Sequence, residues 1–214
     1  MSNKALEKIK IKAKKFFLNA RGSHGWDHIE RVYNIALHIG RKEKADLEIL
    51  KLAALLHDIS REYADKQNGN VCHAEHGAEK AKSILKKFNF PAEKIEKITH
   101  CIKCHRFRGK NIPKSKEAKI LFDADKLDAV GAVGIGRAFL FAGEIGARLH
   151  NSEIDIEKTK AYSKEDTAYR EFALKLSKIK DRMLTREGKN LAQERHKFMV
   201  EFFKKLDKEI AGKE

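Results

Sequence analysis

Residues Asp46–Ile59 read DLEILKLAALLHDI, an apolar helical run that ends in a histidine and an aspartate. Residues three, four and seven positions apart share one side of a helix, so His57 falls on the same face as Leu50 and Ala53. A helix with such an apolar face packs into a core. We therefore expect His57 to point into the interior, where leucine or valine would be the usual residue.

Two other apolar helix faces carry polar residues of the same kind. His28 shares a face with Ile35, and Asp125 lies one turn beyond Leu121. A buried carboxylate is costly unless it is paired or binds a cation. Each residue could instead be a core polar group with its own hydrogen bonds, but together they predict a site for one divalent ion. The predicted ligands are His28, His57, Asp58 and Asp125.

The composition favours an all-α fold. The chain has 214 residues, enough for a sizeable core, but only 2 prolines, and it lacks the many turn signals that a β-sandwich or barrel requires. Helical periodicity predicts the following segments: Ala5–Leu18, a helix ending at Gly40, Asp46–Ile59, His73–Phe88, Ala92–His105, a long or broken helix over Lys116–Gly146, Asp166–Arg182 and Glu187–Ile210. Polar loops are expected at Asp65–Asn70 and Phe107–Ser115, and a charged connection at His150–Ser163.

The formal net charge is +15 at pH 7. Such a charge is typical of proteins that meet polyanions. Here, however, the lysines are spread along the chain and alternate with glutamates, as in Glu93–Lys97, which favours solvated helix faces with local ion pairs. Attraction of phosphorylated small molecules fits the same charge, and nucleic-acid binding is the less favoured interpretation.

Targeting signals and cysteines point to a reducing compartment. No apolar signal core follows Met1, and no uncharged stretch is long enough to span a bilayer. The chain has 3 cysteines, an odd number that argues against a disulfide framework. We expect a cytoplasmic protein without a membrane partner.

The order of the predicted ligands, with their flanking residues, resembles the H…HD…D signature of the HD-domain metal-dependent phosphohydrolases. The matching blocks are SHGWDHIERV (23–32), LAALLHDI (52–59) and DADKLDAVGAVGIGRAF (123–139). They are similar to a subgroup of small bacterial and archaeal HD hydrolases, some of which cleave nucleoside triphosphates to monophosphate and pyrophosphate. Ser60 stands where that subgroup often has glycine, a change that leaves the ligands intact.

The resemblance covers about residues 20–145 and implies a helical HD bundle. Helical periodicity adds a C-terminal helical extension at about 164–211, and we expect one domain over 1–214. The last helices would pack back on that domain or form a homodimer contact. The resemblance also implies one divalent metal ion, with Mn²⁺, Fe²⁺, Co²⁺, Ni²⁺ and Mg²⁺ as candidates. Asp125 is preferred to Asp123 as the ligand, because the family ligand precedes a basic-Leu pair, here Lys126-Leu127.

Further roles follow from position relative to these ligands. Arg31, Arg61 and Lys126 could bind phosphates. His24 could protonate a leaving group, with Asp27 orienting it, and Asp58 serves catalysis as well as metal binding. Asp128 could brace the site from one turn away.

Histidines between the His-Asp pair and Asp125 leave alternatives open. His76 and His105 are expected to line the pocket as substrate contacts, although related two-metal enzymes use such histidines for a second ion. Those enzymes carry a His-His pair, where this chain has Cys104-His105. A structural zinc site built from Cys72, Cys101 and Cys104 is the weakest interpretation, since the CxxC lies in mid-helix and lacks a second copy.

We therefore predict a phosphohydrolase that converts a nucleoside or deoxynucleoside triphosphate to monophosphate and pyrophosphate. Phosphomonoester or phosphodiester hydrolysis at the same site is the first alternative. A nucleic-acid-binding protein with a vestigial metal site is the second, and a dimerising helical module the third. The predicted partner is a small phosphorylated molecule, most simply a nucleotide.

Overall fold

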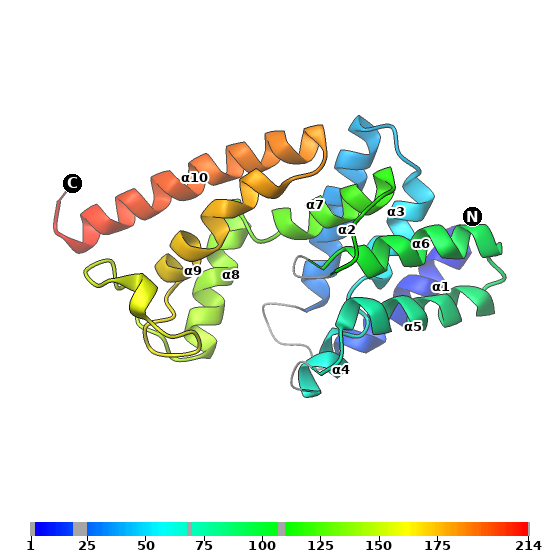
Figure 1. Cartoon of the computed structure of the whole chain (residues 1–214), viewed down its shortest axis with the longest axis horizontal. Helices are drawn as coiled ribbons and strands as arrows, with labels where there is room; N and C mark the ends of the chain where they lie inside the picture. The colour runs from blue at the N-terminus through cyan, green and yellow to red at the C-terminus, as the bar shows by residue number, and fades with distance from the viewer. Residues whose placement is uncertain (1–2, 19–24, 68–69, 107–109, 214) are drawn as a thin grey trace. The chain divides into compact units, whose positions relative to one another are not determined.

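The computed structural model describes residues 3–18, 25–67, 70–106 and 110–213. These residues form helices and no β-strand, which confirms the all-α class (Figure 1). The α-helices are α1 (Asn3–Lys14), α2 (Trp26–Lys42), α3 (Leu47–Leu56), α4 (Arg61–Lys66), α5 (His73–Lys87), α6 (Ala92–Cys104), α7 (Lys116–Leu127), α8 (Gly131–Glu144), α9 (Ala168–Leu174) and α10 (Arg186–Ile210). The 3-10 helices are η1 (Lys15–Phe17), η3 (Ile156–Lys158) and η4 (Leu176–Arg182).

The chain divides into two compact units, residues 1–125 and residues 126–214. The organisation as one domain remains a prediction. None of the described helices is both long and apolar enough to cross a membrane.

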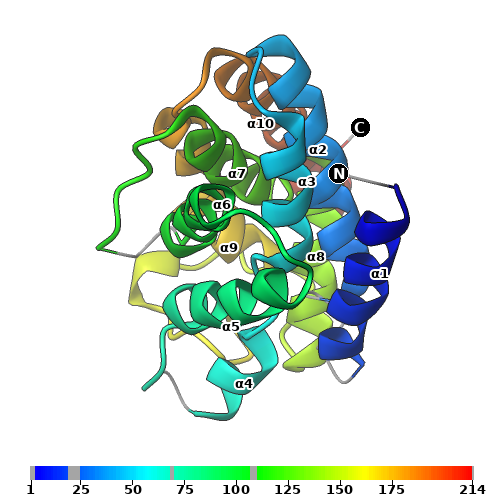
Figure 2. The same cartoon turned by 90° about the vertical axis from the view of Figure 1, so that its right-hand side faces the viewer.

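Helix α3 forms the core of the first unit. It packs against α1, α2, α5 and α6, which surround it (Figure 2). Asp46 caps its start, where the Oδ1 atom accepts hydrogen bonds from the backbone of Glu48 (2.8 Å) and Ile49 (3.1 Å). Leu50 and Leu52 are fully buried, and each such leucine contributes about 2 kcal/mol to folding. This packing fixes the position of His57 at the end of the helix.

Helix α2 continues past the point where the sequence predicted its end. It runs through Gly40 to Lys42. A Cβ atom at residue 40 would collide with the side chains of Leu47 and Leu50 in α3. Gly40 therefore does not end the helix but allows α2 and α3 to approach closely, which sets the position of His28 relative to His57.

Helix α4 covers Arg61–Lys66, so Asp65 and Lys66, the first two residues of the predicted loop at Asp65–Asn70, are helical. It is short and has no apolar period, so the sequence pattern gave no signal for it. Within this helix, Nζ of Lys66 forms an ion pair with Oε1 of Glu62 at 2.6 Å.

Helices α5 and α6 pack along each other (Figure 2). Pro91 precedes the first residue of α6, as expected of a residue with a fixed φ and no N–H. The pairing brings the start of α5 next to the end of α6, where the rings of His73 and His105 lie 5.2 Å apart.

The predicted helix over Lys116–Gly146 is broken into α7 and α8. Gly131 has a φ of +80°, which residues with a side chain rarely adopt. A Cβ atom there would also meet the Arg195 side chain at 2.9 Å. Arg195 in turn donates a hydrogen bond to the carbonyl of Leu127, the last residue of α7. The break between α7 and α8 therefore depends on the packing of α10, which carries Arg195.

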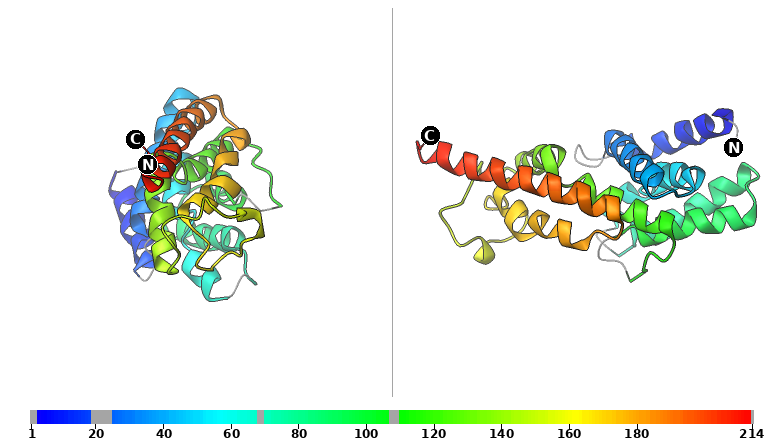
Figure 3. Two further views of the ribbon diagram at one scale, coloured as in Figure 1. Left: turned by 90° about the vertical axis from the view of Figure 1, so that its left-hand side faces the viewer. Right: turned by 90° about the horizontal axis from the view of Figure 1, so that it is seen from above.

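The second unit is built on α8, α9, η4 and α10 (Figure 3). The helix predicted over Asp166–Arg182 is in fact α9 followed by η4, because the chain leaves α geometry at Lys175 (φ −129°). Phe203 of α10 stacks on Phe172 of α9 with ring centroids 4.5 Å apart, and on Phe139 of α8 at 6.4 Å. The last helices thus pack on α8, while a homodimer contact remains a prediction.

Candidate metal centre

His28 enters the site from the first turn of α2. Its side chain is 2% exposed, and the neighbouring Ile29 and Val32 are fully buried. The Nε2 atom of His28 lies 3.4 Å from the Nε2 atom of His57. Two histidines from separate helices therefore point to the same buried space.

His57 is held in one orientation by its own helix. Its Nδ1 atom lies 2.8 Å from the carbonyl oxygen of Ala54. A carbonyl can only accept, so Nδ1 carries the proton, and the Nε2 atom of the neutral ring has a lone pair directed into the site. This is the arrangement by which a backbone carbonyl orients a metal-binding imidazole.

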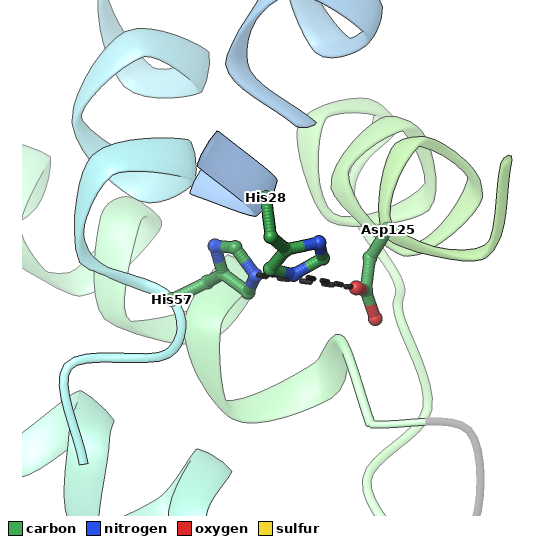
Figure 4. Close-up of side chains that lie close together, drawn as sticks. All are labelled: His28, His57 and Asp125. Atoms are coloured by element: carbon green, nitrogen blue, oxygen red, sulfur yellow. Dashed lines mark hydrogen bonds and ion pairs between the residues drawn. The ribbon is translucent and has the colours of Figure 1, made fainter. Parts of the chain in front are cut away.

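Asp125 completes the group from α7 (Figure 4). Its Oδ1 atom lies 3.5 Å from Nε2 of His28 and 4.0 Å from Nε2 of His57. The candidate ligand atoms of these three residues all lie within 4.8 Å of one another. The Asp125 side chain is 19% exposed, whereas that of Asp123 is fully buried. The structure thus brings Asp125 close to both histidines, and its role as a metal ligand remains a prediction.

Asp58 lies between two pairs of histidines. Its Oδ2 atom is 3.9 Å from Nε2 of His28 and 3.9 Å from Nε2 of His57. Its Oδ1 atom is 3.2 Å from Nε2 of His105 and 3.5 Å from Nε2 of His73. The carboxylate therefore presents one oxygen to each pair.

Burial sets the protonation of the cluster. It lowers the pKa of His57 to about 4, against the opposing charge of Asp58, and it lowers the pKa of His73 to about 3. Burial alone would raise the pKa of the Asp58 carboxyl, but the adjacent His57 and the hydrogen bond with His105 outweigh it, so the pKa stays well below its usual range. Near pH 7, His57 and His73 are therefore neutral and Asp58 is ionised.

These donor atoms fit a divalent cation. The Nε2 lone pair of His57 and the carboxylates of Asp58 and Asp125 are acceptors that face one another in a buried space, an arrangement that a positive ion relieves. Neutral imidazole with carboxylate oxygen is a ligand set suited to Mn²⁺, Fe²⁺, Co²⁺ and Ni²⁺. The protein thus has a His/Asp cluster that could bind a metal, although the identity of the ion remains a prediction.

The predicted phosphate-binding residues lie in different surroundings. The Nη1 atom of Arg61 is 3.2 Å from Nε2 of His73, next to the cluster. Arg31 pairs with Asp27, whose carboxylate is 61% exposed. Partial burial would raise the pKa of Asp27, but the hydrogen bond and charge of Arg31 lower it. His24 lies outside the described residues, so its predicted role with Asp27 stays a prediction.

His76 is turned toward α4. Its Nδ1 atom lies 3.0 Å from Oγ of Ser60, and its ring stacks on Tyr63 at 4.7 Å between centroids. His105, by contrast, is within the cluster. Its Nδ1 atom donates to the Ile102 carbonyl (2.6 Å), which turns Nε2 toward Asp58.

Lys126 and Asp128 are part of the second compact unit. Lys126 is 8% exposed, and Asp128 is fully buried. The carboxylate of Asp128 pairs with Nη1 of Arg137 at 2.7 Å, and that same nitrogen donates to the Asp128 carbonyl at 3.2 Å. The predicted roles of both residues at the site remain predictions.

His73 is the residue to which sequence reasoning gave no role. It is the first residue of α5 and faces Asp58. The only available signal was its place in the histidine-rich segment before α6, three positions from His76. Its orientation depends on the packing of α5 against α6, which the local pattern does not contain.

The cysteines do not gather into a zinc site among the described residues, where the metal-type groups are two His/Asp clusters. Cys101 is buried, which raises the pKa of its thiol to about 12. Cys104 donates to the carbonyl of Ile112, and Cys72 accepts from Arg106.

Sequence comparison connects this cluster to known proteins. A family model of the HD domain matches residues 25–130. This range contains all four predicted ligands. YpgQ of Bacillus subtilis (strain 168), an uncharacterized protein, is 37% identical over 214 residues, which cover 98% of this chain and 95% of YpgQ.

Solved structures show the same fold. The crystal structure of Bacillus subtilis YpgQ in complex with ADP has a TM-score of 0.73 at 32% identity, covering 97% of this chain and 98% of that one. An HD-superfamily hydrolase from Bacillus thuringiensis has a TM-score of 0.76 at 29% identity and covers 97% of each chain. A predicted HD superfamily hydrolase from an uncultured Thermotogales bacterium has a TM-score of 0.70 at 29% identity, covering 95% and 92%.

Proposed function

Because this chain belongs to the HD-domain phosphohydrolase superfamily, we propose that it hydrolyses a nucleoside or deoxynucleoside triphosphate to the monophosphate and pyrophosphate. The observation that carries the proposal is the convergence of His28, His57 and Asp125, with Asp58 beside them, in one buried space. The ADP complex of YpgQ supports a nucleotide as the ligand.

Four residues would hold one divalent ion: His28, His57, Asp58 and Asp125. When bound, such an ion makes water a stronger nucleophile near neutral pH and draws electron density from a phosphoryl oxygen. The candidates are Mn²⁺, Co²⁺, Ni²⁺, Fe²⁺ and Mg²⁺. Nitrogen ligands favour the transition metals over Mg²⁺.

The remaining contributions come from the protein itself. The hydrogen bond to Ala54 keeps the Nε2 lone pair of His57 directed at the site, so no reorientation is needed when a ligand arrives. His28 and His57 are 2% and 0% exposed, which keeps bulk water from this side of the cluster. Asp125, at 19% exposure, marks the side from which a substrate could reach it.

Substrate recognition falls to cationic and imidazole groups around the cluster. Arg61 and His105 are positioned next to Asp58 and its neighbours, and they bind phosphoryl oxygens in this proposal. Arg31, His76 and Lys126 would contact outer parts of the substrate. His24 and Asp27 would supply a proton to the leaving group, and Asp128 would brace the end of α7.

The test is a product assay on the purified chain. ATP, dATP, ADP and AMP are incubated with Mn²⁺, Co²⁺, Ni²⁺ or Mg²⁺, and pyrophosphate and orthophosphate are measured separately. We expect pyrophosphate from the triphosphates and no product in EDTA, with activity restored by added metal. Asp58→Asn should lose turnover, whereas Glu96→Gln, which removes one exposed charge from α6, should not.

Other product patterns would point elsewhere. Orthophosphate from AMP alone would replace the proposal with a nucleotidase acting at the same site. Absence of product from every nucleotide, together with polyanion binding that weakens steeply as salt rises, would favour the nucleic-acid-binding alternative.

A further inference from the structure

The two carboxylate oxygens of Asp58 face two sides of the cluster, and different residues lie on each side. On the Oδ2 side lie His28 and His57, together with Asp125. On the Oδ1 side lie His73 and His105, whose Nε2 atoms are 3.5 Å and 3.2 Å from that oxygen. Geometry alone would allow a cation on either side.

An arginine already occupies the Oδ1 side. Nη1 of Arg61 lies 3.2 Å from Nε2 of His73. A guanidinium has N–H donors and no acceptor, so His73 must accept this hydrogen bond with its Nε2 lone pair. That lone pair is then engaged and does not serve as a ligand for a second metal ion. The positive charge on this side is therefore the guanidinium of Arg61.

Arg61 is fixed yet reachable. It is the first residue of α4, directly after the Asp58–Ser60 turn, and its backbone N–H donates to the Asp58 carbonyl at 2.9 Å. The Nε atom lies 3.7 Å from Oδ1 of Asp65, which restrains the guanidinium from the other end. The side chain remains 30% exposed, so a solute can contact it.

A fixed guanidinium beside a metal-type cluster suits a ligand with two linked anionic groups. Arginine binds phosphoryl oxygens in a planar, bidentate manner, which a lysine cannot reproduce. Arg61 adjoins this cluster through His73 and Asp58, so a ligand with one phosphoryl group at His28, His57 and Asp125 could reach Arg61 with a second, linked one.

We propose that Arg61, positioned by His73, binds the second phosphoryl group of a ligand that contains a diphosphate unit. The inference rests on the proposed function, because it assumes a phosphorylated ligand at the cluster. It gives His73 the role of a positioning residue. It also makes Arg61 the group that distinguishes a ligand with linked phosphates from one with a single phosphate.

The test compares the binding of ADP and AMP by calorimetry, in the presence of Mn²⁺, to the wild type and to five variants. Arg61→Met should weaken ADP binding by about ten-fold or more, the loss expected for a charge-assisted hydrogen bond. Binding of AMP should change by less than about two-fold. Arg61→Lys should also lose affinity for ADP, since it keeps the charge but not the bidentate geometry.

The His73 variants separate positioning from general structural damage. In His73→Leu the acceptor is gone, and ADP affinity should fall by about three- to ten-fold. His73→Gln offers an amide oxygen at a similar distance along the side chain and should restore most of the affinity. Lys66→Met is the matched control, because it removes an α4 cation that pairs with Glu62 and is 68% exposed. It should leave both affinities unchanged.

Three results would overturn the inference: equal losses for ADP and AMP in Arg61→Met, unchanged ADP affinity in that variant, or two bound Mn²⁺ ions per wild-type chain with the second lost in His73→Leu. If the wild type binds neither nucleotide, the proposed nucleotide function fails. Inorganic pyrophosphate and orthophosphate then replace ADP and AMP, and the same ratio decides the role of Arg61. Circular dichroism confirms that each variant is folded.

Discussion

Each of the two compact units buries a group of polar side chains, and the two groups differ in how their atoms are paired. In the second unit one such group consists of Asn151, Asp166, Thr167 and Arg170. Thr167 donates to the side-chain oxygen of Asn151 at 2.6 Å, and the amide of Asn151 donates to the Glu165 carbonyl at 2.8 Å. Arg170 pairs with Asp166 at 2.7 Å. Donor meets acceptor throughout.

In the first unit, the buried group consists of histidines and aspartates whose inward atoms are mostly acceptors. His57 uses its only proton on Ala54, and its Nε2 atom faces His28 and Asp125. These acceptors gather around one buried space, which a cation could occupy.

The difference separates a structural network from a binding site. Arg170 also donates to the hydroxyl and the carbonyl of Thr159, and so ties the connection before α9 to that helix. The network of the second unit is complete by itself and holds a long connection in place. The cluster of the first unit is instead a group of acceptors that could bind a cation. Substitutions in the two groups should therefore affect different properties of the protein.

The largest expected effect is on catalysis in the first unit. Asp125→Asn keeps the shape of the side chain but removes a charged ligand, and turnover should fall by about 10⁴-fold, since a metal contribution of several kcal/mol costs a factor of ten for each 1.4 kcal/mol lost. The free energy of unfolding in EDTA should change by less than about 1 kcal/mol. Steady-state kinetics and urea unfolding measure the two quantities.

Glu117→Gln is the control for Asp125→Asn. It lies on the same helix, and its amide oxygen can still accept the hydrogen bond from the backbone of Asp46. It should leave turnover unchanged. Wild-type turnover in Asp125→Asn would show that this carboxylate is not a ligand.

The next effect is on stability in the second unit. Arg170→Met leaves Asp166 buried without its ion-pair partner and should lower the free energy of unfolding by about 4 kcal/mol. Limited proteolysis should then cut within residues 147–167. Arg148→Met removes surface ion pairs with Glu153 and Glu165 from a side chain that is 43% exposed, and it should cost less than about 1 kcal/mol. Equal costs for the two variants would contradict the comparison.

A smaller effect is expected from pH in the metal-free protein. The pKa of His57 is about 4 in the folded state, against the ordinary histidine value of 6.5 in the unfolded chain, so unfolding takes up a proton between these values. Stability is therefore complete above pH 6.5 and is lost as pH falls toward 4, by about 2 kcal/mol between pH 7 and pH 5 from His57 alone. Thermal unfolding in EDTA at the two pH values measures it.

His57→Gln should reduce this pH dependence, because glutamine does not titrate. His73, whose pKa is lowered to about 3, should account for a further part of the acid sensitivity. If the wild type and His57→Gln lose the same stability between pH 7 and pH 5, the inference that the buried His57 ring is neutral is wrong.

Several features of the fold were predictable because they depend on neighbours in the chain. The apolar period around Leu50 and Leu52 predicts α3, and Pro91 predicts the start of α6. The features that sequence reasoning missed depend on distant residues. Gly40 lies inside α2, where its small size leaves room for the side chain of Leu50 in α3. The break between α7 and α8 at Gly131 reflects the packing of Arg195 against this residue.

The sequence by itself determined the helical class and singled out the four residues that meet in the first unit. A costly polar residue on an apolar helix face is visible in local spacing, and the family resemblance distinguished Asp125 from Asp123. Only the tertiary structure decided the surroundings of Asp58. His73 and Arg61 meet there because α5 packs on α6 and α4 follows α3 in a tight turn, and the direction of a side chain across separate helices is set by packing and not by spacing along the chain.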